Sequence, residues 1–511
     1  MRRNVSLMFA ILLLVVVPLV PGALAGGSPA PLIGIPAESI VVLLLLCLLP
    51  SPPARVVAAV GFGVIIVIAF VLAGIDAGYE AVLDIPFDPL DWQQLGDAFG
   101  VVQGSVGAAT ASGLVALLAV AAAGLIGALS WAALRVGAAV SPARAHGTIV
   151  MATVTTAWAI AAVTGSQLVA GQPAAAAASL HAITASASHA AEGLAARADL
   201  RQQIASDPYR DTRGSDLLTS LRGKDVVFAF IESYGKVAVD DESGLSAGVQ
   251  QVLRDGEAQL RADGYASQSA FLTSPTFGGV SWLAHSTFQT GLWVDRQALY
   301  NKVIRSDRLT LSDAFGAAGW RTVSVIPSNT EPWSFGSSFY HWETMLDANN
   351  VGYRGPRFGY ARIPDQYTWK HFADHELAGD QPVMAEIDLV SSHTPWAPLP
   401  KLVPWAEVGD GSVFRPQPAQ DQSATEVWQD PERVREAYAR SIQYSLGAMF
   451  AFLHNSDDPN LVLVVLGDHQ PATIVSGHGA SHDVPISIIS KDPAVFESIS
   501  GWRWQEGMLP A

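Results

Sequence analysis

The stretch Leu461-Val-Leu-Val-Val-Leu-Gly467-Asp468-His469-Gln470-Pro471 decides the fold. Its first six residues are apolar without alternation, which is typical of a strand buried on both faces in a parallel sheet. Ligands of open α/β sheets bind beyond the carboxyl ends of the strands, where Asp468 and His469 stand. Adjacent Asp and His are suitable metal ligands. For an isolated pair, the alternative is a turn aspartate with a chance histidine beside it.

A second segment, Asp225-Val-Val-Phe-Ala-Phe-Ile231, has the same design and ends on Glu232. Two further strands are predicted at Arg321–Ile326 and Val383–Leu389, and three helices at Ser246–Ala262, Leu309–Ala318 and Glu432–His454. Strands that alternate with helices indicate an α/β domain with a mostly parallel central sheet covered on both faces. The Pro-rich segment Leu402–Pro431 is interpreted as a surface insertion.

Composition divides the chain into an apolar first third and a globular remainder. Half of the 511 residues are hydrophobic and only 15% are charged, mostly after residue 195. The net charge of −16 gives no electrostatic footprint for nucleic acid, so a nucleic-acid partner is not expected. The single cysteine, Cys47, lies in an apolar run, which excludes a disulfide framework and a cysteine-ligated zinc site.

Five apolar segments are long enough, or nearly so, to cross a membrane, which takes about 20 helical residues. They are Val5–Leu24, Pro31–Leu49, Val56–Ile75, Gly107–Leu134 and Thr148–Val169. Buried core helices are the alternative, but five such runs in series with little charge favour membrane spans. The sequence therefore predicts a five-helix transmembrane region at 1–170, a helical juxtamembrane linker at 171–222 and a globular α/β domain at 223–511. One helix from Pro173 to Ile204 is expected in the linker, without strands.

The distribution of Lys and Arg sets the orientation. Arg2 and Arg3 precede the first segment, Arg55 follows the second, and Arg135 and Arg144 lie between the last two. Basic loops stay in the cytoplasm, so everything after residue 170 is expected outside it, in a multi-pass membrane protein. The loop 76–103 has six acidic residues and no Lys or Arg. Ala23-Leu24-Ala25 also resembles a signal-peptidase site, and cleavage there would leave this orientation unchanged.

A nucleophile candidate follows a Gly-Gly turn in Phe277-Gly278-Gly279-Val280-Ser281. Glycines allow close backbone approach, and the start of a helix stabilises a phosphate or an oxyanion. Ser281 is equally suited to be an ordinary helix N-cap. The residues alone leave both interpretations open.

Taken together, the motifs of the last 300 residues resemble those of lipoteichoic acid synthases. In order, they are Phe-Ile-Glu232-Ser, Gly-Gly-Val-Ser281, Ser391-Ser-His393-Thr-Pro-Trp, Tyr438…Ser441-Ile-Gln-Tyr444 and Gly-Asp468-His469. Those synthases belong, with phosphoglycerol and phosphoethanolamine transferases, to the sulfatase-like branch of the alkaline phosphatase superfamily. The resemblance implies a sulfatase-like α/β domain outside the cytoplasm, behind membrane helices.

By this resemblance, Glu232, Asp468 and His469 would hold one divalent metal ion, and Ser281 would complete its shell as the nucleophile. The family usually has Thr at this position. An O,O,O,N donor set suits Mn²⁺ and also accepts Zn²⁺ or Mg²⁺. Metal coordination lowers the pKa of a hydroxyl and so activates a weak nucleophile.

The resemblance also implies a substrate-binding set. His393 would contact the phosphate, although a polar loop histidine is the alternative. Asn329 and Trp333 match the pocket residues of the family, but Phe335 stands where the family has Arg, which puts a phosphoglycerol headgroup in doubt. His482, before a Val-Pro strand start, is expected as a further binding or second-metal residue. His285, His478, Glu386 and Asp388 are interpreted as ordinary surface, turn or structural residues.

Two functions follow from the resemblance. The first is a membrane-anchored transferase that moves a phospho-headgroup of the phosphoglycerol or phosphoethanolamine type. The donor would be a membrane phospholipid, the acceptor an envelope glycan or polymer, and the intermediate a phospho-Ser281. The second is a hydrolase, a phosphodiesterase or a sulfuric ester hydrolase. The chain has no Cys/Ser-x-Pro-x-Arg run, which counts against a formylglycine sulfatase. The intact Glu232, Ser281, Asp468 and His469 set counts against a non-catalytic binding protein.

Overall fold

The structure, a computed structural model, describes residues 2–92, 96, 99, 108–140, 144–241 and 244–510. The chain divides into two compact units, Met1–Glu80 with Ile85–Ala196 and Ala81–Asp84 with Arg197–Ala511. Gly107, where the fourth predicted apolar segment begins, and most of 93–103 in the acidic loop lie outside the described residues.

The first unit consists of apolar helices. They are α1 (Arg2–Val16), α2 (Val20–Ala25), α3 (Ala37–Leu48), α4 (Pro52–Leu83), α6 (Ala108–Val140) and α7 (Arg144–Thr164). Among the described residues, four helical stretches are long and apolar enough to cross a membrane: Asn4–Ala25, Pro52–Ala81, Ala108–Val140 and Gly147–Thr164. The α-helix within the predicted segment Pro31–Leu49 is the 12-residue α3, which at about 1.5 Å per residue is roughly 18 Å long. A count of five spans therefore stays a prediction.

Two pairs of short strands also belong to this unit. β1 (Ile35–Pro36) pairs with β4 (Ala175–Ala176), and β2 (Gln167–Val169) pairs with β3 (Gln172–Pro173). The expectation of no strands after residue 170 is therefore wrong for β3 and β4. The long linker helix, α8 (Ala178–Ala205), consequently begins five residues later than predicted, because Pro173 and the residues after it belong to these pairings.

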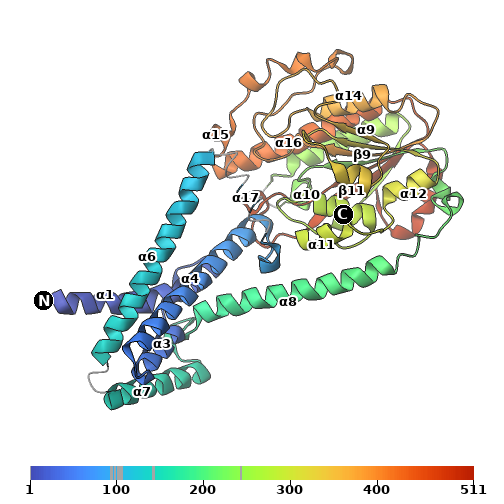
Figure 1. Cartoon of the computed structure of the whole chain (residues 1–511). Helices are drawn as coiled ribbons and strands as arrows, with labels where there is room; N and C mark the ends of the chain where they lie inside the picture. Colours follow the sequence, from blue (N-terminus) through green and yellow to red (C-terminus); the bar gives the residue numbers. More distant parts are fainter. Residues whose placement is uncertain are drawn as a thin grey trace. The chain divides into compact units, whose positions relative to one another are not determined.

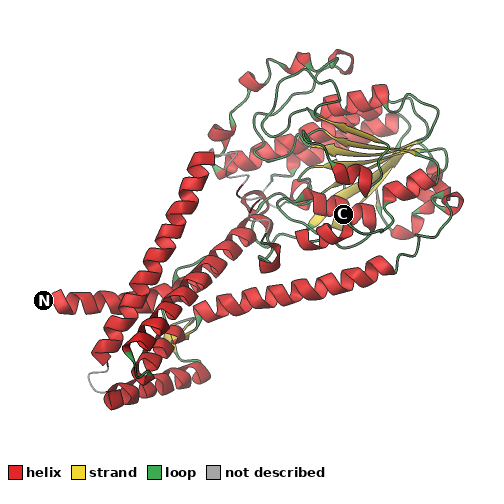
Figure 2. Ribbon diagram, viewed as in Figure 1, coloured by secondary structure: helices red, strands yellow, loops and turns green. Residues whose placement is uncertain are grey.

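An eight-stranded sheet forms the centre of the second unit, in the order β12-β6-β11-β10-β5-β9-β7-β8. Its strands are yellow in Figure 2. The parallel strands are β5 (Asp225–Ile231), β7 (Arg321–Ile326), β8 (Thr344–Asp347), β9 (Val383–Leu389) and β10 (Leu461–Gly467). Antiparallel pairing adds β6 (Ala266–Thr273), β11 (Asp483–Ser490) and β12 (Gln505–Glu506). The predicted α/β class with a mostly parallel sheet is confirmed.

Helices cover both faces of this sheet (Figure 1). Val227, Ala229 and Ile231 of β5 belong to the core shared with α9 (Ala247–Ala262), α14 (Asp365–His375) and α16 (Pro431–His454). The alternate residues Phe228 and Phe230 contact Phe288 of α10 (Ser281–Thr290) on the opposite face. Burial of each such side chain contributes about 1.5–3 kcal/mol, so both faces of the central strands fix the sheet in place.

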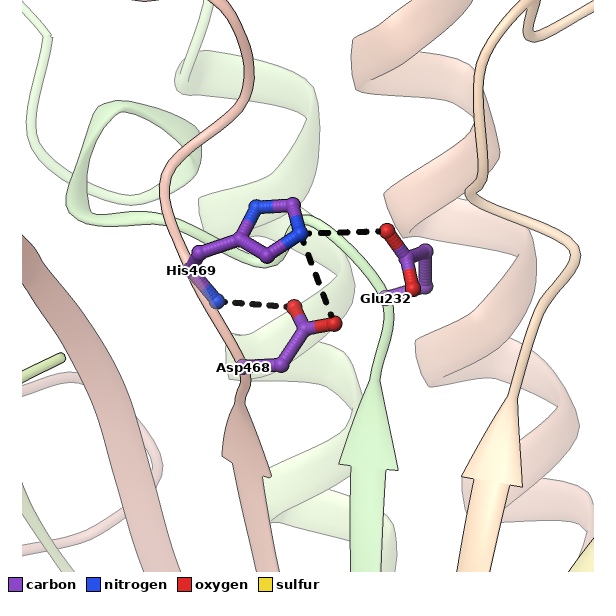
Figure 3. A group of neighbouring side chains, drawn as sticks. All are labelled: Glu232, Asp468 and His469. Carbon is purple, nitrogen blue, oxygen red and sulfur yellow. Dashed lines mark hydrogen bonds and ion pairs between the residues drawn. The ribbon is translucent and has the colours of Figure 1, made fainter. Parts of the chain in front are cut away.

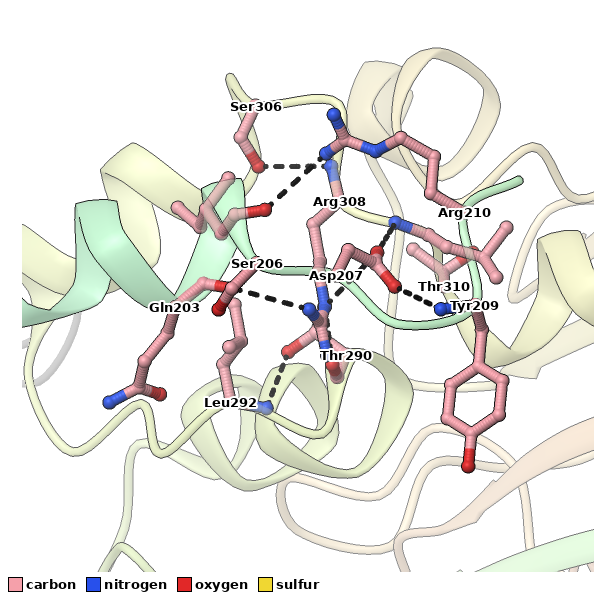
Figure 4. Close-up of polar contacts among 12 residues, drawn as sticks. Gln203, Ser206, Asp207, Tyr209, Arg210, Thr290, Leu292, Ser306, Arg308 and Thr310 are labelled. Carbon is pink, nitrogen blue, oxygen red and sulfur yellow. Dashed lines mark hydrogen bonds and ion pairs between the residues drawn. The ribbon is translucent and has the colours of Figure 1, made fainter. Parts of the chain in front are cut away.

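A buried carboxylate helps to hold the segment after α8 in place within the second unit (Figure 4). Asp207, whose side chain is 3% exposed, accepts hydrogen bonds from the backbone N–H groups of Tyr209 and Leu309, both at 3.0 Å. Its ion-pair partner is Arg308, at 3.5 Å, which also donates to the carbonyl of Thr290 at the end of α10. This network ties the linker to the helix that begins with Ser281.

Candidate metal and nucleophile site

Two neighbouring strands bring the predicted carboxylates together. β5 and β10 are parallel and in register, with Ile231 opposite Gly467 at their carboxyl ends. Glu232 and Asp468 are the next residues on the two chains, so they meet at one sheet edge together with His469 (Figure 3). One donor atom from each of these three residues lies within 4.8 Å of the others.

Backbone groups orient both Asp468 and His469. The Asp468 Oδ1 accepts hydrogen bonds from the N–H groups of Ser233 and His469, at 2.7 and 2.8 Å, which leaves Oδ2 directed at the cluster. His469 Nδ1 lies 2.7 Å from the carbonyl oxygen of Gln470. Because a carbonyl only accepts, Nδ1 carries a proton, and Nε2 is the nitrogen available to a metal ion. Nε2 lies 3.3 Å from Glu232 Oε1 and 3.7 Å from Asp468 Oδ2.

The cluster is electrostatically coupled. Burial, together with the charge of Glu232, raises the pKa of Asp468 to about 6. Burial also opposes ionisation of Glu232, but the neighbouring His393 and His469 outweigh it and hold the pKa of Glu232 well below its usual range. Burial likewise disfavours a charged His469, yet the two carboxylates raise the pKa of His469 to about 9. Positive charge is thus strongly stabilised at this point, as a metal site requires.

Ser281 completes the set. Its Oγ lies 3.1 Å from Glu232 Oε2 and 3.2 Å from His469 Nε2. The helix N-cap is Val280, not Ser281, and the Ser281 hydroxyl makes no capping bond. The structure therefore contradicts the N-cap interpretation of Ser281.

Strained backbone positions this serine. Val280 has φ 57°, a left-handed conformation that is unusual for a β-branched residue, and Gly278 has φ 68°. The loop is held against the end of β10 by the hydrogen bond from Gly278 N–H to the carbonyl of Gln470, at 2.9 Å. The first residue of α10 is consequently turned toward the carboxylates rather than back over its own helix.

The donor set fits a divalent metal ion. Two carboxylates, one imidazole nitrogen with a fixed tautomer and one hydroxyl converge, and Asp468 and His469 are 2% and 1% exposed. Oxygen-rich sets with one imidazole are typical of Mn²⁺ sites and are also found with Zn²⁺ and Mg²⁺.

A cavity of about 740 Å³ opens beside this cluster. His393, Asn329 and Trp333 line it together with Glu232, Ser281 and Asp468. His393 stacks on Tyr360 with the ring centres 3.7 Å apart, and its Nδ1 lies 2.6 Å from the carbonyl of Thr394. His482 packs against Phe277 instead and is not one of the described cavity-lining residues, so its binding role stays a prediction.

Sequence reasoning missed three residues of the cavity wall. His285 lies 2.9 Å from Glu386 and 3.6 Å from Asp388, and all three side chains line the cavity. Their spacing carried a signal. His285 is four residues after Ser281, which is one helical turn, and Glu386 and Asp388 alternate along one strand. Which sheet face the carboxylates occupy follows from the pairing of β9 with β5, where Glu386 is opposite Phe228.

No protein-family model matches the chain. No curated protein matches its sequence. Among solved structures, it is similar to the integral membrane protein lipooligosaccharide phosphoethanolamine transferase A (EptA) from Neisseria meningitidis. The identity is 13% and the TM-score 0.46, over 97% of this chain and 90% of that one.

Two other solved structures align with a smaller part of the chain. For the phosphoglycerol transferase GacH from Streptococcus pyogenes, the identity is 14% and the TM-score 0.36, over 57% and 74% of the two chains. For the lipoteichoic acid synthase LtaP from Listeria monocytogenes, the values are 12% and 0.33, over 53% of this chain and 66% of that one. At these identities and TM-scores the likenesses identify no activity.

Proposed function

We propose that the chain is a metal-dependent, membrane-anchored transferase of the sulfatase (alkaline phosphatase) superfamily. It would move a phospho-headgroup from a membrane phospholipid to an envelope glycan or polymer through a phospho-Ser281 intermediate. The observation that carries the proposal is the position of the Ser281 hydroxyl, 3.1 Å from Glu232 and 3.2 Å from His469 at the edge of the cavity. A half-buried serine beside such a donor set has the surroundings of an activated nucleophile.

Glu232, Asp468, His469 and Ser281 would hold the metal ion, with Mn²⁺ the best match to their donor atoms. When bound, a divalent ion lowers the pKa of a hydroxyl and polarises a phosphoryl group. The chain contributes the geometry: backbone bonds fix Asp468 and His469, and the Val280 conformation directs Ser281 toward them.

The proposed reaction has two displacements. First, the Ser281 oxygen attacks the lipid phosphorus and loses its proton, and the bond between phosphorus and the diacylglycerol oxygen breaks. Diacylglycerol leaves after taking up one proton. Second, a hydroxyl of the acceptor attacks the same phosphorus, the bond to Ser281 Oγ breaks, and the acceptor's proton restores the serine hydroxyl. His393, which lines the cavity, would contact the phosphoryl oxygens.

A hydrolase would share the first displacement and use water in the second. The membrane helices favour the transferase, because four candidate spans keep the enzyme in the same membrane as a lipid donor. Residues 223–511 would form the catalytic domain outside the cytoplasm, behind the 1–170 membrane region and the 171–222 linker.

The test uses the full chain in lipid vesicles that contain labelled phosphatidylglycerol and phosphatidylethanolamine. We expect diacylglycerol release that is lost on treatment with EDTA and restored by Mn²⁺, and lost in Ser281→Ala. Ser281→Thr should keep part of the activity, because it retains a hydroxyl. Product analysis with and without an added glycan acceptor separates transfer from hydrolysis. Release that persists in EDTA or in Ser281→Ala would refute the proposal.

A further inference from the structure

The cavity beside Ser281 has a second polar wall, built from β9 and α10. Glu386 and Asp388 alternate on β9 and lie opposite Phe228 and Phe230 of β5, which places them on the α10 side of the sheet. His285 lies between them, 2.9 Å from Glu386 Oε1 and 3.6 Å from Asp388 Oδ1. These side chains are only 11–20% exposed, and what remains accessible faces the cavity.

Side-chain contacts hold His285 and Glu386 of this wall in place. The side-chain amide of Gln289, one turn after His285, donates to the second oxygen of Glu386. The His285 ring lies against Phe230, with the ring centres 4.1 Å apart. Asp388 Oδ1 is buried and accepts no hydrogen bond within the described part of the chain. The Asp388 side chain as a whole is 20% exposed and lines the cavity, so a positively charged donor in the cavity can approach this carboxylate.

The wall gives the cavity an excess of negative charge. Four carboxylates line it, from Glu232, Glu386, Asp388 and Asp468, whereas its described lining residues include no Lys or Arg. Burial raises the pKa of Asp388 to about 7, an effect that His285 opposes and the neighbouring carboxylates reinforce, so the cavity disfavours further negative charge. A phosphodiester brings one more negative charge, which a cationic group on the same substrate would offset.

Aromatic rings line the same cavity as these carboxylates. Trp333 and Tyr340 form a pair with ring centres 5.3 Å apart, and both line the cavity. Burial raises the pKa of Tyr340 well above its usual value, and the charge of Glu386 adds to the effect. Burial likewise raises the pKa of Tyr360, with contributions from the carboxylates of Glu232 and Asp388. Carboxylates next to aromatic faces are the surroundings that bind ammonium groups through ion pairing and cation–π contact.

We propose that the Glu386–Asp388 wall and the Trp333–Tyr340 pair bind a substrate ammonium group, so that the donor headgroup is an ammonium-bearing phosphodiester rather than phosphoglycerol. The inference rests on the proposed function for the phosphodiester and adds the class of headgroup. The metal ion would then bind the phosphate end of the zwitterionic headgroup, and the Glu386–Asp388 wall would bind its ammonium end. A headgroup with only hydroxyls at that end would bind more weakly.

The experiment measures binding without turnover. Full-length Ser281→Ala, loaded with Mn²⁺, is titrated with two soluble diesters, glycerophosphoethanolamine and glycerophosphoglycerol. We expect the ammonium diester to bind about tenfold more tightly. Asp388→Asn in the same background should remove most of this preference and change glycerophosphoglycerol binding less than about twofold. Asp374→Asn, an exposed carboxylate of α14 paired with Lys370, is the matched control and should keep the preference.

A second pair of variants tests the aromatic part and does not depend on the folding of Asp388→Asn. Trp333→Leu should reduce the preference for the ammonium diester, and Trp333→Phe should keep part of it. Equal or tighter binding of glycerophosphoglycerol, or an equal loss for both diesters in Asp388→Asn, would overturn the proposal. Binding of a second equivalent of Mn²⁺ that is lost in Asp388→Asn would also overturn the proposal, because the wall would then bind a metal ion instead of an ammonium group.

Turnover of the two lipids separates this inference from the proposed function. Selective binding of the ammonium diester without release of diacylglycerol from any lipid would refute the proposed transferase function and support ammonium binding by the wall. Faster consumption of phosphatidylglycerol than of phosphatidylethanolamine would support the transferase function and refute ammonium binding by the wall.

Discussion

Ser281 differs from the other hydroxyl residues near it in what its oxygen can reach. Thr276 is 2% exposed and its hydroxyl contacts Ser274, whereas Thr287 accepts a hydrogen bond from the N–H of Val294. Both are engaged in holding the loop and the end of α10. Only Ser281, among these three, faces Glu232 and His469. The proposal of Ser281 as the nucleophile thus rests on the direction of one side chain at the start of one helix.

Removal of one carboxylate should empty the metal site. Asp468 contributes a buried oxygen that is aimed by two backbone N–H groups, and no other described carboxylate joins Glu232 and His469 within 4.8 Å. We expect Asp468→Ala to reduce bound Mn²⁺ at least about tenfold, since second-sphere changes alone cost 10–100-fold in metal affinity. Elemental analysis of the purified protein measures it, with Asp374→Ala as control. If a folded Asp468→Ala protein bound as much Mn²⁺ per chain as wild type, the proposed metal site would be refuted.

The cluster of Glu232, Asp468 and His469 could be predicted from the sequence because these residues directly follow buried strands, and strand ends in a parallel sheet share an edge. The role of His285 could not. Its partners Glu386 and Asp388 are 101 and 103 positions away, and only the register of β9 against β5 shows which face they occupy. The sequence also could not separate a nucleophile from an N-cap at Ser281. That choice depends on the left-handed Val280, a conformation that local propensity disfavours.

At the scale of elements, a buried aspartate joins the helices behind the site. Asp365, the first residue of α14, is fully buried. Its Oδ1 accepts from the N–H and the hydroxyl of Ser391, at 2.9 and 2.8 Å, and its Oδ2 from the hydroxyl of Ser445 on α16, at 2.6 Å. Ser391 follows β9 and precedes His393 by two residues. Asp365 therefore connects α14 and α16 to the loop that carries His393.

This aspartate makes folding stability depend on pH. Burial raises the pKa of Asp365 from an ordinary value of 3.8 to about 6, although Ser445 and Ser391 oppose the shift. Between these values the folded chain keeps a proton that the unfolded chain gives up. Its contribution to the free energy of unfolding is therefore full below pH 4 and declines as the pH rises to about 6, by about 2–3 kcal/mol.

Asp365→Asn should remove this part of the pH dependence. The amide oxygen can still accept from Ser391, and the Ser445 hydroxyl can accept from the amide NH₂. The Tm of wild type should fall relative to that of Asp365→Asn between pH 4.5 and 6.5, followed by tryptophan fluorescence. The difference in Tm between the two proteins at each pH removes the contribution of the other carboxylates, which both proteins share. Parallel Tm profiles over this range would show that Asp365 titrates normally.

Most of the elements that position the site were predictable, and the exceptions have physical causes. β5, β7 and β9 have the predicted bounds, and β10 differs by one residue, because continuous apolar runs mark buried central strands. β6 was missed because its residues, Ala-Ser-Gln-Ser-Ala-Phe-Leu-Thr, lack that pattern. It lies near an edge of the sheet, where only the two-residue β12 covers it on one side.

At the scale of the whole molecule, contacts inside the first unit bear on the membrane topology. Arg135 contacts Ser6, which places it at the same end of the unit as the N-terminal arginines. At the other end, β1 pairs with β4, so residues 35 and 175 lie together. The basic end is expected in the cytoplasm, which puts residue 175 outside. Arg55 follows α3 and is also expected on the cytoplasmic side, so the short α3 must return the chain to the basic end of the unit.

We therefore predict that reporters inserted at Ser28 and fused at the C-terminus are outside the cytoplasm, whereas one at Ser51 is inside. The reason is that α3 and its flanking residues bring Arg55 back to the basic end, despite the short length of the helix. Paired fusions of a reporter active only in the cytoplasm and one active only outside it give the answer at each site. A C-terminal fusion active in the cytoplasm would contradict this topology.

The central claim, that Ser281 is a metal-dependent nucleophile, is tested most directly by mapping the covalent intermediate. The Mn²⁺-loaded protein is incubated with labelled phosphatidylethanolamine without acceptor, quenched in acid, digested and examined by mass spectrometry. We predict a phosphoethanolamine adduct on Ser281 that is absent in EDTA and in Ser281→Ala. An adduct on Thr276 or Thr287, with normal turnover by Ser281→Ala, would contradict the account.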